Sequence, residues 1–242
     1  MDPHGLIQSL IYIWIPLIAV SCGALIASAV TIPRWLYSGT HHFTAGVVLV
    51  AVCAELLPPM MSSHAPINVA IGFLLGVALL LLVKLFTRRS DGGADTSLNT
   101  SFWIASLIDL LVDGMLLAIG FNVDLRTGLF ITIALSGEIF FLGLAFSTSL
   151  RAKRQSTVMI VASTFSFGAA LLLGNLIGAL AIALIADQYD VIFMSFGAAA
   201  LLYLVTEELL NEAHHGEQNL WMCSMFFLGF ILFLVIDMLM AA

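Results

Sequence analysis

The sequence predicts an all-α integral membrane protein, and two properties of the whole chain indicate this fold class. Of the 242 residues, 61% are hydrophobic and only 10% are charged, and the mean hydropathy is +1.10. Such values are typical of membrane proteins rather than of soluble domains. The apolar residues also form about eight stretches, each near the roughly 20 residues that a helix needs to cross a bilayer. We therefore expect eight transmembrane helices in one transporter domain, residues 1–242.

Short polar or proline-containing segments separate the eight predicted spans. In chain order the spans are Leu10–Ile32, Phe43–Met61, Ile67–Phe86, Ser101–Phe121, Gly128–Leu150, Val158–Ala186, Val191–Leu210 and Leu220–Met240. Two pairs of glycines within these spans, Gly72 with Gly76 and Gly174 with Gly178, have the small-xxx-small spacing that permits close contact between helices. Little of the chain is left for loops, so we expect no module outside the membrane.

Basic residues predict the orientation, because cytoplasmic loops collect Lys and Arg. Arg126 falls in the fourth loop, and all other basic residues fall in the first, third and fifth loops or at the adjoining span ends: Arg34, Lys84, Arg88, Arg89, Arg151, Lys153 and Arg154. Both termini are therefore expected outside, and the compact loops favour a bacterial cytoplasmic membrane. Because the basic residues are scattered, they predict no phosphate-binding face and no nucleic-acid partner.

Two pairs of spans share a motif. Span two contains Phe43 and Glu55 in the pattern FTAGV…ELL, and span seven contains Phe196 and Glu208 in FGAAA…ELL with the same spacing. Spans three and eight contain the similar segments GFLL and GFIL. Because spans two and seven run in opposite directions, we expect spans 1–3 and 6–8 to form an inverted repeat around spans 4–5, as in many transporters. Chance similarity among apolar helices is the alternative.

Three spans carry oxygen-bearing side chains near their centres: Asp109 and Asp113 in span four, Glu138 in span five and Asn175 in span six. Asp109 and Asp113 share a helix face because they lie four residues apart. An ionisable residue inside a membrane indicates a functional site, whereas a single Asn more often bonds a neighbouring helix. No Lys or Arg lies in the central part of a predicted span. We interpret the four residues as a site for a divalent cation.

Carboxylate and amide oxygens suit hard or borderline ions such as Mn²⁺ and Fe²⁺, and Zn²⁺ accepts carboxylates as well. The metal is expected as the transported substrate and not as a cofactor. Three carboxylates exceed the charge of one divalent ion, so we also expect protons to leave the site when the metal binds.

Further acidic residues and histidines lie toward the ends of two spans. Glu55 is late in span two and is expected near the outer face, as an entrance. A cluster follows span seven on the cytoplasmic side and is interpreted as a secondary metal or exit site: Glu207, Glu208, Glu212, His214 and His215. The alternative is a solvated helix end. His41 and His42 precede span two on the same side.

The chain resembles the ZIP (Zrt-, Irt-like protein) family of divalent metal transporters across nearly its whole length. The resemblance lies in the eight-span plan and in the segments FTAGVVLVAVCAELLPP, DLLVDG, SGEIFFLGLA and YLVTEELLNEAHHGE. Asp113-Gly114 matches the Glu/Asp-Gly of the family's span-four pattern, and Glu138 matches the Glu that follows a His in span five. The resemblance implies alternating access of one helix group against a scaffold and a homodimer.

Several positions depart from the family pattern. Asp109 stands where the family has a metal-binding His, and Gly137 stands in place of a second His. Leu110 and Phe141 occupy positions where the family has Asn and a second Glu. Because neither side chain has a ligand atom, we expect one metal ion rather than two, and the loss of imidazoles weakens a preference for zinc.

The sequence therefore predicts a ZIP-like secondary carrier for a divalent metal (zinc, manganese or iron), and no enzyme. Two alternatives remain open. A ZIP-like protein without transport activity would act as a metal sensor or structural subunit. An intramembrane metal-dependent hydrolase would use the carboxylates and the metal to activate water, although no nucleophile motif is present.

Overall fold

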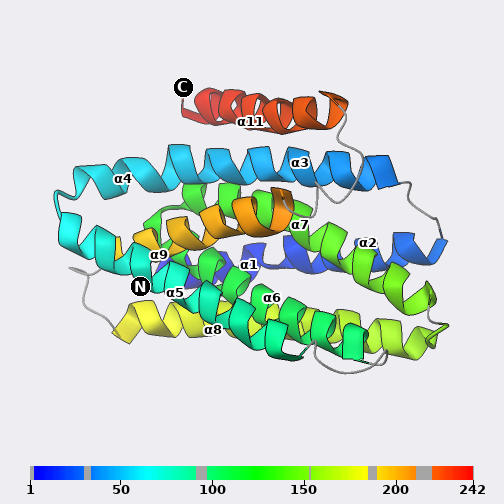
Figure 1. Ribbon diagram of the computed structural model, residues 1–242. Helices are drawn as coiled ribbons and strands as arrows, with labels where there is room; N and C mark the ends of the chain where they lie inside the picture. The colour runs from blue at the N-terminus through cyan, green and yellow to red at the C-terminus, as the bar shows by residue number, and fades with distance from the viewer. Residues whose placement is uncertain are drawn as a thin grey trace. The chain divides into compact units, whose positions relative to one another are not determined.

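The computed structural model describes residues 3–29, 34–90, 97–152, 154–184, 190–210 and 220–241. Within these ranges nearly every residue is helical and no strand occurs (Figure 1). The prediction of an all-α protein is therefore confirmed for the part of the chain that the structure describes.

The helices are labelled as in Figure 1. The first part of the chain forms α1 (Pro3–Tyr12), α2 (Trp14–Ala29), α3 (Arg34–Val50), the π-helix η1 (Ala51–Leu56), α4 (Leu57–Ser62) and α5 (Pro66–Ser90). The second part forms α6 (Ser97–Val123), α7 (Leu125–Ala152), α8 (Thr157–Leu184), α9 (Asp190–Tyr203), the π-helix η3 (Leu204–Leu209) and α11 (Leu220–Ala241).

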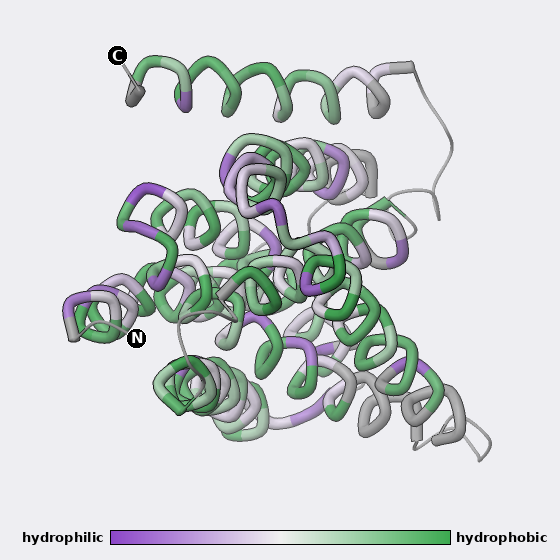
Figure 2. The backbone as a smooth tube through the Cα atoms, turned by 90° about the vertical axis from the view of Figure 1, so that its left-hand side faces the viewer, coloured by the Kyte–Doolittle hydropathy of each residue, from purple (hydrophilic) through white to green (hydrophobic). Residues whose placement is uncertain are grey.

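The length and surface of these helices fit a membrane protein. Five apolar stretches are long enough to cross a bilayer: His4–Ala27, Ser38–Ser62, Ser106–Val123, Leu125–Arg151 and Thr157–Leu184. Three shorter apolar helices, Pro66–Leu82, Val191–Glu207 and Ser224–Leu239, coincide with the other three predicted spans. Hydrophobic residues dominate the described helices (Figure 2), and Phe165, Leu184 and Leu239 are 72–79% exposed. Such side chains are unfavourable in water and suited to lipid.

The first span differs in detail from the prediction. It begins near the amino terminus and consists of α1 and α2, which meet at Ile13. Pro16 has no N–H, so it cannot donate the helical hydrogen bond to the carbonyl of Tyr12. The neighbouring bonds persist, from Ile13 N to Ser9 O at 3.0 Å and from Leu17 N to Ile13 O at 3.2 Å. The proline therefore interrupts the helix without ending the span.

The helices group into two compact units, which we describe separately. Unit 1 comprises Met1–Thr31 and Ala78–Ala186, and unit 2 comprises Ile32–Val77 and Asp187–Ala242. Helix α5 crosses the boundary between the two. The expected single domain stays a prediction.

Unit 1 contains two helix pairs in backbone contact, α2 with α7 and α6 with α8. Four glycines mark these contacts, each against a backbone carbonyl of the other helix: Gly23 against Phe140 and Gly143 against Val20 in the first pair, and Gly114 against Leu171 and Gly174 against Leu111 in the second. Any larger residue at these positions would force the helices apart. The close contact expected at Gly174 and Gly178 is confirmed, because Gly178 lies against Met115.

Unit 2 uses glycines in the same way. Gly46 of α3 lies against Phe226 of α11, and Gly229 of α11 lies against Phe43 of α3. The predicted contact glycines of α5 are confirmed here as well, since Gly72 lies against Ile192 and Gly76 against Phe196. Unit 2 therefore contains two helix pairs in close contact, α3 with α11 and the first part of α5 with α9.

Both π-helices lie in unit 2, at the two motifs that the sequence shares. Each begins the same number of residues after the Phe of its motif, and each contains the Glu of that motif, Glu55 in η1 and Glu208 in η3. The hydrogen bonds of a π-helix span one residue more than those of an α-helix, and single π-helical turns are frequent at functional sites.

Candidate metal site

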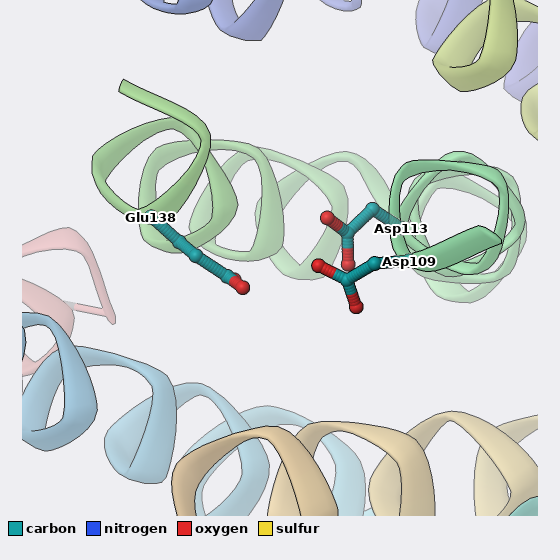
Figure 3. A group of neighbouring side chains, drawn as sticks. All are labelled: Asp109, Asp113 and Glu138. Carbon is teal, nitrogen blue, oxygen red and sulfur yellow. The ribbon is translucent and has the colours of Figure 1, made fainter. Parts of the chain in front are cut away.

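Three acidic side chains meet inside unit 1. Asp109 and Asp113 lie one turn apart on α6, and Glu138 reaches toward them from α7 (Figure 3). One carboxylate oxygen from each residue lies within 4.8 Å of those from the other two. The structure therefore brings together three of the four residues that the sequence places at the centre of the site.

The helix geometry explains this convergence. Residues i and i+4 of a helix share one face, and α6 packs against α7 along that face. Asp113 is 2% exposed and Glu138 is 7% exposed, while Asp109 is half-buried. Ser106, one turn before Asp109 on the same helix, is also buried. The group is thus an oxygen-rich cluster in a mainly apolar interior.

The separation of the oxygens suits one divalent ion. Metal–oxygen distances are about 2.0–2.2 Å for Zn²⁺ and about 2.3–2.6 Å for Ca²⁺. Two oxygens on opposite sides of one ion are therefore about 4.0–5.2 Å apart, and other pairs of ligands are closer, so three oxygens that all lie within 4.8 Å of one another are close enough to share an ion. All the ligand atoms are carboxylate oxygens, which hard divalent ions prefer. Three ionised carboxylates this close repel one another, so a cation or protons would stabilise the arrangement.

Helix α8 supports the turn of α6 that carries Asp113. Gly114, the next residue, lies with its backbone against Leu171 and Asn175 of α8. A methyl group at this position would overlap the Leu171 carbonyl oxygen. The Asp-Gly pair therefore has a structural explanation, because the aspartate contributes to the cluster and the glycine lets α8 approach.

Asn175, the fourth predicted residue, lies in α8 and is fully buried. Its Nδ2 donates a hydrogen bond to the Gly114 carbonyl oxygen at 3.4 Å. Its Oδ1 accepts one from the hydroxyl of Ser9 at 3.2 Å. Both ends of the amide are thus bonded to other helices, and its role as a metal ligand stays a prediction.

Sequence reasoning missed Ser9. This serine of α1 is 0% exposed and lies 166 positions from its partner Asn175. Its hydroxyl is also 3.0 Å from the Leu6 carbonyl oxygen. A lone serine in an apolar segment has no spacing that distinguishes it, so only the fold reveals this contact.

The described residues among those predicted at the two mouths lie in unit 2. Glu55 is buried in η1, whereas Glu207 is exposed in η3. The backbone of Glu208 also lies in η3. Glu212, His214 and His215 lie outside the described residues, so the predicted exit cluster stays a prediction. His41 and His42 are buried in α3, a helix that contacts η3, and His42 Nδ1 is 2.9 Å from the Ser38 carbonyl oxygen.

Comparison of the sequence with protein-family models finds no match, and no curated protein matches it either.

Proposed function

We propose that this protein is a secondary carrier that moves a divalent metal ion across a membrane through a site formed by Asp109, Asp113 and Glu138. The observation that supports the proposal is the meeting of three carboxylate oxygens from two helices within 4.8 Å. An all-oxygen site favours Mn²⁺ or Fe²⁺ over Zn²⁺, because Zn²⁺ sites typically include imidazole or thiolate ligands. The resemblance to ZIP transporters is part of this proposal, because Asp113 and Glu138 are two of the residues that match the family's patterns.

The packing of the helices supports the inverted repeat that we propose with this function. In unit 1 the two helix pairs make contacts of the same form, because each helix of a pair places a Gly against a backbone carbonyl of the other helix. Exchanging α2 with α8 and α7 with α6 therefore converts the contacts of one pair into those of the other pair. Under this exchange Leu111 corresponds to Phe140. Asp109 lies two residues before Leu111 and Glu138 lies two residues before Phe140, so the two acids also correspond.

Unit 2 supports the same repeat. The exchange of α3 with α9 and α11 with α5 matches the contact of Gly229 against Phe43 with that of Gly76 against Phe196, although Ala199 stands at the position equivalent to Gly46. It also pairs the two motifs that contain η1 and η3. Asp109 and Glu138 would then occupy equivalent positions in spans four and five, which lie between the two repeats, and sites near the midplane between repeats are common in transporters.

Uptake into vesicles tests the function. Protein reconstituted into sealed liposomes is expected to load Mn²⁺, and Asp113→Asn is expected to abolish loading. Asp124→Asn is the matched control, because Asp124 is an exposed carboxylate that bonds Thr127 N at 2.8 Å at the turn between the same helices. Metal binding without loading would favour the sensor or structural subunit, and hydrolytic activity would favour the hydrolase.

The proposed orientation, with both termini outside a bacterial cytoplasmic membrane, has a separate test. Asp124 belongs to an outer loop in this orientation, and Arg154 belongs to an inner loop. In a variant without native cysteines, a thiol reagent that cannot cross membranes should label Asp124→Cys in intact cells and leave Arg154→Cys unlabelled until the cells are opened. The reverse pattern would contradict the orientation.

A further inference from the structure

The amide of Asn175 links three helices next to the acidic cluster. It belongs to α8, donates to the Gly114 carbonyl oxygen of α6 and accepts from Ser9 of α1. Gly114 directly follows Asp113, so the amide bonds the backbone of the turn that presents this carboxylate. Ser9 and Asn175 are both 0% exposed.

The polarity of these bonds distinguishes two roles for Asn175. A metal ligand would use only the amide oxygen, and a carboxylate at the same position would serve as well or better. A residue that positions α6 needs the amide nitrogen, because only a donor can bond the Gly114 carbonyl oxygen. Ser9 bonds the other end of the amide through a hydroxyl that it shares with the Leu6 carbonyl oxygen, and the Gly114 carbonyl oxygen, which only accepts, sets which end of the amide faces α6.

We propose that Asn175 and Ser9 act as a positioning pair, which fixes the α6 turn bearing Asp113 so that its carboxylate meets Asp109 and Glu138, and that neither residue binds the metal. This inference rests on the metal site proposed above. Residues that orient metal ligands through hydrogen bonds typically change metal affinity by about 10- to 100-fold when they are replaced.

Three variants separate positioning from ligation. Asn175→Asp retains an oxygen and adds a charge but loses the donor to Gly114. We expect this variant to bind Mn²⁺ at least about tenfold more weakly than the native protein. Ser9→Ala should weaken binding in the same direction, although Ser9 lies on a different helix. Because the two residues form one network, Ser9→Ala with Asn175→Asp should be little weaker than Asn175→Asp alone.

A second hydrogen bond between α6 and α8 provides the matched control. Trp103 Nε1 donates to Ser166 Oγ at 3.0 Å. Ser166→Ala removes a bond between the same two helices without touching the Asp113 turn. We expect it to lower the thermal unfolding temperature in detergent as Ser9→Ala does, while Mn²⁺ affinity and the electron paramagnetic resonance spectrum of bound Mn²⁺ stay native.

The test is a Mn²⁺ titration of purified full-length protein, followed by equilibrium binding and by that spectrum. Weaker binding with an altered spectrum in both Asn175→Asp and Ser9→Ala, but not in Ser166→Ala, supports the positioning pair. Native or tighter binding by Asn175→Asp would show a ligand, and native binding by Ser9→Ala would also overturn the inference. If the native protein binds no Mn²⁺, or if Asp113→Asn binds it as tightly as the native protein, the proposed function itself fails and the inference with it.

Discussion

Units 1 and 2 share a packing device and differ in the chemistry that they place on it. Each contains two helix pairs in backbone contact at glycines. In unit 1 the acids lie on successive turns of α6 and on the adjacent α7, so they meet. In unit 2, His41 and Glu55 lie fourteen positions apart along α3 and η1, which is about 21 Å of helix. Among the described residues, a group of three clustered ligands occurs in unit 1 alone. Close packing thus brings helices together, and the register of the acids decides whether a site forms.

The largest effect is expected where packing and site coincide. Gly174→Ala would place a methyl group onto the carbonyl oxygen of Leu111, so α6 and α8 would have to separate beside Asp113. We expect the free energy of unfolding in detergent to fall by about 3 kcal/mol, the upper range for overpacking, and Mn²⁺ binding to be lost with it. Denaturant titration of the purified protein measures the first effect.

Gly39→Ala is the matched substitution in unit 2. A methyl group there meets only the Met225 side chain, at 3.8 Å, which is an ordinary contact. Since alanine is the better helix former by up to about 1 kcal/mol, stability should be unchanged or slightly raised. Equal losses in the two variants would contradict the assignment of close contact to Gly174.

Asp113→Asn should separate binding from stability. Removing one of three neighbouring carboxylates relieves their mutual repulsion, so the metal-free protein should unfold at the same or a higher temperature. Mn²⁺ affinity should fall by more than about 100-fold, the most that loss of an outer-shell partner usually causes. Isothermal titration calorimetry and thermal unfolding on the same sample test both parts. A large loss of stability without metal would show instead that Asp113 is a structural residue.

Metal binding should also release protons. Three ionised carboxylates within 4.8 Å are unfavourable in a low-dielectric interior, so at least one is expected to hold a proton until the cation arrives. Calorimetry in buffers of different ionisation enthalpy counts the protons released at neutral pH. The Asp113→Asn variant should release fewer protons than the native protein when both are saturated with metal. Binding of Mn²⁺ without proton release would contradict this charge balance.

Much of the fold could be predicted from the sequence, because the requirement that drives it is local. A helix that crosses lipid satisfies its backbone hydrogen bonds within about 20 apolar residues, and that pattern is visible without knowledge of neighbours. The meeting of Asp109, Asp113 and Glu138 was also predictable. Ionisable residues are rare inside membrane spans, so acids at similar depth in two consecutive spans have few other polar groups to contact. The break at Ile13 was not predicted, although Pro16 is its local signal.

Contacts between distant residues could not be predicted in the same way. The hydrogen bond from Ser9 to Asn175 depends on how α1, α6 and α8 pack. Nothing in the sequence around either residue indicates that the other is its partner. The π-helices η1 and η3 also lacked a sequence signal that we recognised. Only the shared motif around Glu55 and Glu208 indicated that these two places in the chain are related.

The smallest effect is expected from Glu55, the buried acid of unit 2. Because it lies outside the three-carboxylate cluster, Glu55→Gln should leave equilibrium Mn²⁺ affinity unchanged in detergent. As an acid predicted near the outer mouth, it would raise the local cation concentration, so its loss should slow uptake into vesicles by up to about tenfold and reduce the dependence of uptake on ionic strength. Glu207→Gln, at an exposed residue of η3, is the control for the opposite mouth. If Glu55→Gln lost affinity as Asp113→Asn does, the division of binding chemistry between the units would be wrong, because Glu55 would then act as a ligand.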